Sequence, residues 1–295
     1  MNDLVYAVEL TITGLLIGVM YAMVALGFVL IYKASAVFNF AQGAMTLFAA
    51  LMVVGLRPVF GLAGALAAAL AGMAVIAVAV ERFVLRPLVG RSALAIFMAT
   101  VAVASILEGV AQIVWGNQPR GLKLDLPAAP LQFHGVYVSP ADLMGAGVAG
   151  LSVLLIALFF RWTRVGLGLR ALASDPIAAQ AMGVPTHRVW AAAWTLAGAV
   201  AIVAGVLWGS RIGVHFGMTQ ITLKALPILI IGGIESIPGV ILAGLLVGAA
   251  EALGEGFLGP IVGGGVQEMI AYLAALLVLL LRPHGLLGEK SVERI

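Results

Sequence analysis

The sequence predicts an all-α protein, a polytopic bundle of helices embedded in a membrane. Of the 295 residues, 63% are hydrophobic and only 10% are charged, and the mean hydropathy is +1.15. A soluble domain carries about 25% charged residues. Apolar runs long enough to cross a bilayer, about 20 residues each, recur along the whole chain with no polar domain between them. We therefore expect a single transmembrane domain over residues 1–295.

The apolar runs predict eight or nine membrane segments. Two of them are short, with about 14 residues each, so each is either a full crossing or a broken or re-entrant helix. These two are 42–55 and 220–233. In chain order, the expected segments are 5–32, 42–55, 59–83, 93–115, 140–160, 188–209, 220–233, 238–254 and 264–281.

The distribution of basic residues predicts the orientation of the segments. Eleven Lys and Arg residues fall in loops on one side and five on the other, and the richer side is expected to be cytoplasmic. The N-terminus is then outside and the C-terminus cytoplasmic, with 116–139 as an ordered exterior loop, with or without a short hairpin. The richer side has Lys33, Arg82, Arg86, Arg91, Arg161, Arg164, Arg170, Arg188, Arg282, Lys290 and Arg294, and the other has Arg57, Arg120, Lys123, Arg211 and Lys224.

The cytoplasmic loop 161–187 contains a predicted short helix at 176–182. Asp175 is a suitable N-cap, and Gly183 followed by Pro185 ends the helix. A rod of roughly 10 Å is too short to be stable alone. It is therefore either a connector at the level of the lipid headgroups or a segment that docks on another protein.

Several stretches resemble a known family. In "IAAQAMG", Ala178, Ala179 and Gly183 match the Glu-Ala-Ala…Gly loop motif of ABC-transporter permeases, whereas Ile177 stands where the motif has glutamate. Any charge contact made by that glutamate is therefore not carried over. Together with "ALGFVLIYKASAVFNFAQGAM", "LPILIIGGIESIPGVILAGLLVG" and "LLLRPHGLLG", the motif resembles the LivH-type permease of branched-chain amino-acid ABC transporters over nearly the whole chain.

The resemblance implies a permease subunit of an ABC importer in the bacterial cytoplasmic (inner) membrane. Its partners would be two ATP-binding subunits, a second related permease and a periplasmic or extracellular substrate-binding protein. Energy must come from these partners, because the chain has no G-x-x-x-x-G-K-[ST] motif. The helix at 176–182 would couple to the ATPase through Asp175, Ala178, Ala179, Met182 and Gly183.

The resemblance leaves the cargo and the pairing of permeases open. Leucine, isoleucine and valine are the default substrates, but similar permeases carry urea, short amides or aromatic acids. A heterodimer of related permeases is the family expectation, and a homodimer is the alternative.

Polar residues at membrane depth are the candidates for the translocation pathway, because they are costly in lipid. Asn39, Gln42 and Gly43, where the second segment starts, either contribute to the pathway or its cytoplasmic gate or only satisfy the backbone of a helix start. Glu235 and Ser236 are expected to be exposed at the cytoplasmic side in "GGIESIPG", which is either an ordinary turn or a gate or hinge beside the ATPase.

Carboxylates within the apolar segments have more than one interpretation. Glu108 shares a helical face with Gln112, and it pairs with Lys224, lines the exterior mouth of the pathway or is protonated within the bundle. Glu251 and Glu268 are expected to be solvated near the ends of their segments.

Glycines at small-x-x-x-small spacing predict close helix packing. Examples are Gly14 with Gly18 and Gly244 with Gly248.

Several functional classes lack the residues they need. The chain has no cysteine, and its four histidines lie in separate loops without metal-ligand spacing. There is no nucleophile motif, and the basic residues are too dispersed for a nucleic-acid surface. We expect no catalysis, cofactor or metal. Two rivals remain, an ion-coupled secondary transporter of small polar solutes, hinted at by Glu108 and the interrupted 220–254 region, and a membrane scaffold.

Overall fold

The computed structural model describes residues 3–36, 38–88, 90–122, 124, 129–133 and 135–288. Lys123, His134, Lys290 and Arg294, which entered the charge count or the search for metal ligands, lie outside these ranges. The elements are α1 (Asp3–Ser35), α2 (Gln42–Val80), η1 (Glu81–Leu85), η2 (Arg86–Leu88), α3 (Ala93–Trp115), β1 (Leu131–Phe133), β2 (Val136–Val138), α4 (Pro140–Trp162), α5 (Arg164–Ser174), α6 (Pro176–Ala181), α7 (Thr186–Ile212), η3 (Phe216–Met218), α8 (Thr219–Gly232), α9 (Ile237–Val262) and α10 (Val266–Leu281).

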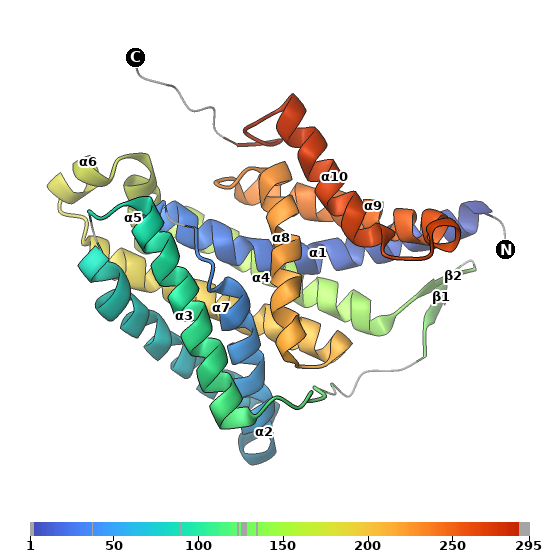
Figure 1. Ribbon diagram of the computed structural model, residues 1–295, viewed down its shortest axis with the longest axis horizontal. Coiled ribbons are helices and arrows are strands. Elements are labelled where there is room, and N and C mark those ends of the chain that lie inside the picture. The colour runs from blue at the N-terminus through green and yellow to red at the C-terminus, as the bar shows by residue number, and fades with distance from the viewer. Residues whose placement is uncertain are drawn as a thin grey trace. The chain divides into compact units, whose positions relative to one another are not determined.

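The chain forms two compact units, each made of segments distant in sequence (Figure 1). Unit 1 comprises 1–25, 124–151 and 224–295, and unit 2 comprises 26–123 and 152–223. Three of the four boundaries fall inside α1, α4 and α8, so each of these helices contributes to both units.

Helices α2, α3 and α7 form the core of unit 2, with α2 packed against both of the others (Figure 1). Small residues allow the backbones of α2 and α7 to approach each other closely. A Cβ on Gly205 of α7 would lie 2.6 Å from the carbonyl oxygen of Thr46 on α2. On α7, Ala193, Ala197 and Ala201 are also fully buried. The backbones of α2 and α7 are therefore in direct contact.

Helix α2 joins the two segments that the sequence analysis separated. The helix continues from Gln42 to Val80, and the break lies at Gly61, whose φ of 67° and ψ of −179° are outside the helical region. This conformation is open almost only to glycine. Pro58, which lacks an N–H donor, lies just before the kink. The predicted break between 55 and 59 is therefore misplaced by a few residues, because the glycine and not the Arg57–Pro58 pair interrupts the helix.

Unit 1 contains the N-terminal part of α1 packed against α9, and a hairpin of α9 and α10. The predicted glycine pairs meet in this contact. A Cβ on Gly244 would lie 2.7 Å from the carbonyl oxygen of Gly18, and one on Gly14 would lie 2.5 Å from that of Gly248. The spacing of these four glycines thus reports a close helix crossing, as expected from the sequence.

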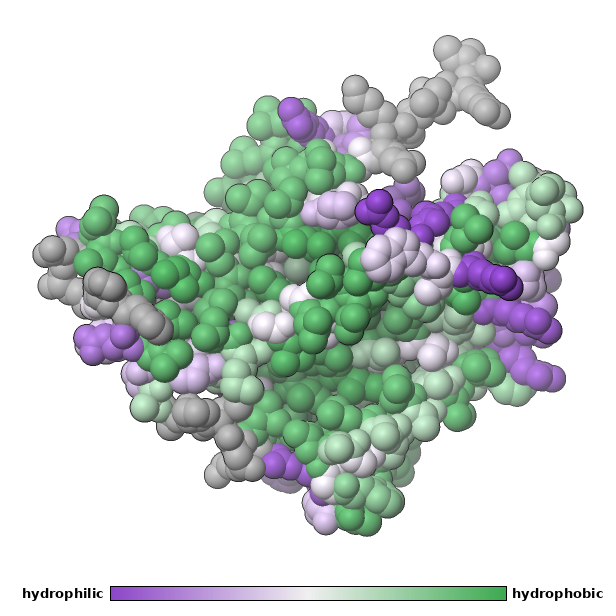
Figure 2. All heavy atoms as spheres, turned by 180° about the vertical axis from the view of Figure 1, so that it is seen from behind, coloured by the Kyte–Doolittle hydropathy of each residue, from purple (hydrophilic) through white to green (hydrophobic). Residues whose placement is uncertain are grey.

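Six helices are long and apolar enough to cross a membrane, namely α1, α2, α3, α4, α7 and α9, and two shorter apolar helices cover 216–232 and 266–281. Figure 2 shows a mainly apolar surface, with hydrophilic residues gathered at the edge where α5 and α6 lie. Large apolar side chains face outward on the long helices, as at Ile113, which is 86% exposed. Such a surface is suited to lipid. The all-α expectation is confirmed, apart from the hairpin of β1 and β2.

The loop 161–187 holds more structure than the sequence analysis predicted. Helix α5 was missed, although Thr163 caps it by accepting from the N–H of Gly166 at 3.0 Å. Its residues are less apolar than a membrane segment, and its two glycines weaken a helix prediction. Both glycines are buried where the chain packs closely, and a Cβ on Gly168 would lie 3.1 Å from Val189.

Candidate functional site

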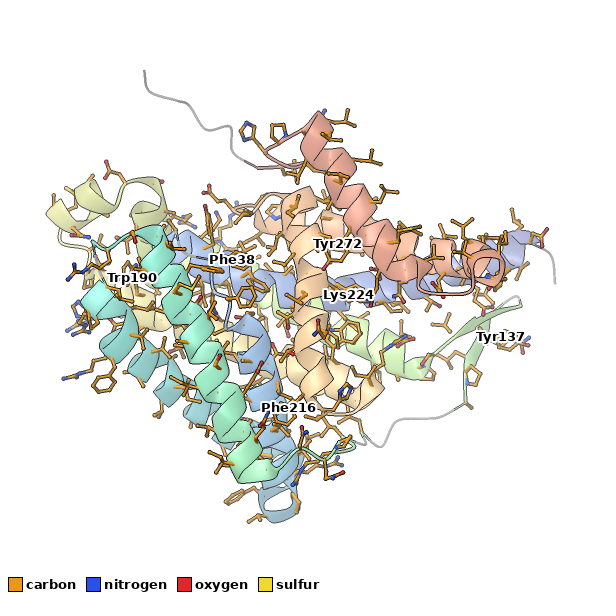
Figure 3. The ribbon with its side chains drawn as sticks, in the orientation of Figure 1. Phe38, Tyr137, Trp190, Phe216, Lys224 and Tyr272 are labelled. Carbon is orange, nitrogen blue, oxygen red and sulfur yellow. The ribbon has the colours of Figure 1, made fainter. Side chains whose placement is uncertain are left out.

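The connection between α1 and α2 packs against α1 within unit 2. The ring of Phe38 stacks on that of Phe28 in α1, with centroids 4.9 Å apart (Figure 3). A Cβ on Gly27 would collide with the Gln42 amide. Gly27 lies roughly 12 Å before the end of α1, measured along the helix. The chain therefore turns back toward the middle of α1 before α2 begins.

Thr100 of α3 holds the same connection from another side. Its hydroxyl accepts from the N–H of Phe40 at 3.1 Å, and a contact to the Phe38 carbonyl oxygen measures 3.4 Å. Thr100 lies roughly 10 Å beyond the start of α3. Irregular backbone at such depth is tolerated only where protein buries it or where it lines a cavity. The start of α2 is thus a discontinuity within the bundle.

Asn39 and Gln42 are both fully buried at this discontinuity. Asn39 Oδ1 accepts from the N–H of Ala41 at 3.1 Å, which closes a turn into the helix. Asn39 Nδ2 donates to Gln42 Oε1 at 3.4 Å and approaches the sulfur of Met45 at 3.6 Å. Asn39 therefore does serve the helix start, as one of the two sequence interpretations held.

The side-chain amide of Gln42 does not form all the hydrogen bonds that it can make. Within the residues that the structure describes, its Nε2 makes no hydrogen bond although it is buried. The Thr222 hydroxyl of α8 is in the same situation. A Cβ on Gly43 would lie 3.1 Å from Thr222 Oγ1 and 3.3 Å from the carbonyl oxygen of Thr219. The starts of α2 and α8 therefore meet, with Gly43 between them.

Thr222 and Thr100 were not predicted as site residues. Each is a threonine in a mainly apolar stretch, and each is at most 3% exposed. Threonine often satisfies its hydroxyl on its own helix backbone, so its presence carries little signal. Thr100 does so in part, because its hydroxyl donates to the Phe97 carbonyl oxygen at 2.8 Å. Only the fold shows that these two face the start of α2.

Helix α6 has the caps that the sequence predicted. Asp175 Oδ1 accepts from the N–H of Ala178 at 2.9 Å. At the other end, Gly183 has a φ of 82°, and the N–H of Val184 donates to the Ala179 carbonyl oxygen at 3.0 Å. The helix ends at Ala181, so Met182 belongs to the turn that follows.

The side chains of α6 divide into an anchored and an exposed group. Ala179 is 5% exposed, and α6 packs against α5, whereas Ala178 is exposed and Met182 is 85% exposed. The side chain of Ile177 lies outside the described ones. Ala179 and Gly183 thus maintain the helix. The residues exposed to a partner are Ala178, Gln180, Ala181 and Met182.

Glu235 and Ser236 lie in the turn between α8 and α9 in unit 1. Glu235 is exposed, but Ser236 is half-buried, and its hydroxyl caps α9 by accepting from the N–H of Gly239 at 3.1 Å. Ser236 was expected to be exposed, and the correction follows from this capping role. The N–H groups of Leu286 and Leu287 donate to the carbonyl oxygens of Ile231 and Gly232 at 2.7 and 3.3 Å, so the C-terminal segment fixes the same turn.

Lys224, one partner considered for Glu108, forms an ion pair with Glu268 of α10 at 3.5 Å (Figure 3). Glu108 itself is half-buried on α3, and Gln112 is exposed. The Glu268 side chain is 70% exposed, in agreement with its expected solvation.

The expectation for Glu251 is wrong. It lies near the middle of α9 and is 1% exposed, because α10 folds back over it. Its Oε2 accepts from Gln267 Nε2 at 2.9 Å, and Tyr21 lies close enough to interact with the carboxylate. One turn on, Glu255 Oε2 accepts from the N–H of Gln267 at 3.0 Å. The two glutamates thus fasten the start of α10 to α9.

Metal-ligating side chains do not gather in the described part of the chain, where no three His, Asp or Glu residues form a cluster able to hold an ion.

The comparison with family models gives one match that covers nearly the whole chain. Residues 10–281 match the model described as "Branched-chain amino acid transport system / permease component". The chain belongs to this family. The family model therefore includes the start of α2, the α6 segment and the α9–α10 hairpin described above.

Named relatives cover the same length. The permease BraD of a high-affinity branched-chain amino acid transport system from Pseudomonas aeruginosa is 28% identical and aligns over 100% of both chains. The corresponding LivH protein of Escherichia coli is 29% identical over 100% of this chain and 99% of its own. A probable LivH of Methanocaldococcus jannaschii is 28% identical over 92% of this chain and 90% of its own.

One solved structure, PsaBC from Streptococcus pneumoniae in complex with a Fab, aligns with 92% of this chain and 89% of its own at 18% identity and a TM-score of 0.45. This level of similarity supports no conclusion about the site.

Proposed function

We propose that this chain is the membrane-spanning permease subunit of an ABC importer for branched-chain or related amino acids. The observation that carries the proposal is the family match over residues 10–281, together with relatives of the same length whose names state this role. Both units are assigned to one permease domain. The subunit forms the translocation pathway and has no ATPase site of its own.

The coupling segment of this importer is α6. Its caps hold it as a helix, Ala179 anchors it against α5, and Ala178 and Met182 face outward. A partner ATPase that closes on ATP binding would push this helix and shift the permease between inward-open and outward-open states. The proposal places α6, the turn with Glu235 and Ser236, and the C-terminus on the cytoplasmic side, following the excess of basic residues there.

The pathway includes the discontinuity at Asn39, Gln42 and Gly43. This assignment is supported by the burial of two amide side chains within an apolar bundle. Polar side chains at such a place are energetically costly and usually have a function. Glu108 is assigned to the same pathway as a half-buried carboxylate of unit 2. The partners are two ATP-binding subunits, a second related permease and a substrate-binding protein, in a bacterial inner membrane.

An ion-coupled secondary transporter remains as the alternative, and the buried carboxylate of Glu251 is the observation that favours it. Reconstituted vesicles separate the two. Uptake of leucine by an importer requires ATP and the ATP-binding subunit, whereas ion-coupled uptake follows an imposed proton or sodium gradient without ATP.

The role of α6 is tested at two exposed positions, Ala178 in the helix and Met182 in the turn that follows it. We expect Met182→Glu and Ala178→Glu to weaken association with the ATPase and to reduce uptake at least tenfold, because each puts a buried charge into the docking contact. Pull-down of the ATPase and ATP-driven uptake measure these effects. Leu167→Glu, at another exposed apolar residue on α5, is the matched control. Normal association and uptake in both α6 variants would remove this helix from the mechanism.

A further inference from the structure

The exposed face of α4 ends in an arginine and a tryptophan. The leucines that face outward in the second half of this helix are Leu151, Leu154 and Leu155, each more than half exposed. Trp162 lies seven residues after Leu155, and Arg161 is its neighbour. Seven residues make almost two turns, so Trp162 continues the face of Leu155 roughly 10 Å further along the helix. Arg161 is exposed and Trp162 is 74% exposed, so both are accessible at the end of the apolar stripe.

The end of this stripe is suited to the level of the lipid headgroups. Helix α4 is long and apolar enough to cross a bilayer, and an outward row of leucines on such a helix is suited to acyl chains. Tryptophan is enriched where acyl chains give way to headgroups, because its ring is apolar and its N–H is polar. The row of leucines followed by Trp162 therefore places the end of α4 at the boundary between membrane and water.

Helix α5 brings two more arginines to the end of α4. Thr163 alone separates the two helices, and it caps the start of α5. Arg164 is the first residue of α5 and lies three residues after Arg161. Arg170, further along α5, donates from Nη1 to the carbonyl oxygen of Phe160 in the last turn of α4. The corner between α4 and α5 therefore gathers three guanidinium groups.

The three arginines at this corner carry positive charge that no carboxylate neutralises. All three are exposed, and none of them forms an ion pair with any residue that the structure describes. The segment 161–174 contains no Asp or Glu. Figure 2 shows hydrophilic residues gathered at the edge of the molecule where α5 lies. The corner is therefore a basic surface at the end of a lipid-facing helix.

This combination of groups favours an anionic phospholipid as the occupant. Guanidinium groups bind phosphate through paired N–H donors, and basic residues next to a membrane are attracted to anionic lipids. An acidic protein surface would also satisfy the charges, but it gives no reason for the exposed Trp162 at the end of a row of leucines. The coupling segment α6 offers no such charge, because 175–186 contains no Lys or Arg.

We propose that the corner between α4 and α5 binds the phosphate group of an anionic phospholipid through Arg161 and Arg164. Arg170 adds a third positive charge, and the ring of Trp162 packs against the lipid where the headgroup joins the acyl chains. The acyl chains follow the exposed leucines of α4. The inference requires only that α4 lies in a bilayer, so it is independent of the proposed function.

The test measures lipid binding to the full-length chain in detergent by native mass spectrometry, with the chain alone and with its ATP-binding subunit. The probes are phosphatidylglycerol, which has a net negative charge, and phosphatidylcholine with the same acyl chains, which has none. We expect phosphatidylglycerol to bind at least about tenfold more tightly, because several arginines contribute to the attraction. This preference should fall at high salt, which screens exposed charges.

Substitutions locate the site. Arg161→Gln and Arg164→Gln should each weaken phosphatidylglycerol binding about fivefold and leave phosphatidylcholine binding unchanged. Arg164→Lys keeps the charge and should lose less than about twofold. Arg211→Gln is the matched control, because Arg211 is also exposed but lies at the far end of α7, roughly 33 Å along the helix from Val189, which packs against α5. This control should leave phosphatidylglycerol binding unchanged.

Several results would overturn the proposal. Equal binding of the two lipids would show that the corner does not select an anionic headgroup. If Arg211→Gln weakened phosphatidylglycerol as much as Arg161→Gln and Arg164→Gln, net charge alone would explain the binding. If the ATP-binding subunit displaced the lipid and Arg164→Gln weakened the association of that subunit, the corner would be a protein contact.

Two further measurements keep these outcomes apart. Melting temperatures should be the same for the glutamine variants and the unaltered chain, since the substituted side chains are exposed. If a variant fails to fold, the preference of the unaltered chain for phosphatidylglycerol and its loss at high salt still test the proposal. If no ATP-binding subunit associates with the chain, the proposed function fails and the lipid measurements on the chain alone stand.

Discussion

At the scale of single residues, Glu251 shows how a carboxylate is accommodated in an apolar helix. Its Oε2 accepts from the Gln267 amide at 2.9 Å, and the carboxylate is sheltered by α10. A buried group of this kind is stabilised by its partner and is costly once the partner is lost. Its position within the bundle could not be read from the sequence, since an apolar run with one glutamate looks the same whether the residue faces lipid, protein or water.

We expect Glu251→Ala to destabilise the permease by about 1–3 kcal/mol, because it leaves the half-buried Gln267 amide without this partner. Glu251→Gln should be much milder, since an amide oxygen still accepts from Gln267. Glu268→Gln, at a 70% exposed side chain, is the control and should cost less than about 1 kcal/mol. Unfolding of the purified protein in mild detergent measures all three. Equal stability of Glu251→Ala and Glu268→Gln would contradict a structural role for the Gln267 contact.

The residues of the candidate site were predictable to different degrees. Asn39 and Gln42 stand out, because amides are rare within apolar segments, and both lie at the discontinuity. Their depth was not predictable, since it depends on contacts with Gly27 and Thr100, which belong to other helices. Thr222 comes from a different part of the chain and gives no sequence signal of its own.

At the scale of elements, the α1–α9 crossing is the contact in which glycines matter most. The carbonyl oxygens of Gly14 and Gly18 occupy the space that side chains on Gly248 and Gly244 would need. The close approach depends on all four positions. The lengths of the apolar runs predicted the helices. The spacing of the glycines indicated in addition which faces of the helices pack closely.

Gly244→Ala should destabilise the protein by about 1–3 kcal/mol, because its methyl group would lie 2.7 Å from the Gly18 carbonyl oxygen and force the helices apart. Gly147→Ala on α4 is the matched control in the same unit. Nothing lies within 4 Å of its Cβ position, so it should be neutral or stabilise the helix by up to about 1 kcal/mol. Melting temperatures of the two variants give the comparison, and equal shifts would refute close packing at this crossing.

Element boundaries were predicted well where they coincide with strong chemical signals. Ser92 and Trp115 bracket α3 at the predicted segment 93–115, and the Asp175 cap fixes the start of α6. The break between the predicted segments 42–55 and 59–83 was misplaced by a few residues, because the non-helical conformation lies at Gly61. Helix α5 was missed because tertiary contacts, and not intrinsic propensity, order its glycine-containing sequence.

At the scale of the whole molecule, composition was enough to predict a membrane-embedded α-helical protein. Six helices long enough to span a bilayer agree with that expectation. The grouping into two units was not predictable, because α1, α4 and α8 each contribute to both, and only one of the four boundaries, that between 123 and 124, falls in a loop. The positive-inside pattern remains the basis for the proposed orientation.

The depth of the α1–α2 connection has a consequence for how the chain exchanges its amide hydrogens with solvent. A link between two helices usually takes up deuterium within moments, but Asn39, Ala41 and Gln42 are fully buried, and the N–H groups of Phe40 and Ala41 are held by Thr100 and Asn39. We expect these few positions to exchange as slowly as the helices around them in the resting transporter, and to become labelled in pulses once ATP turnover begins. A mass-spectrometric time course over one short peptide would then record each opening of the pathway without any attached dye.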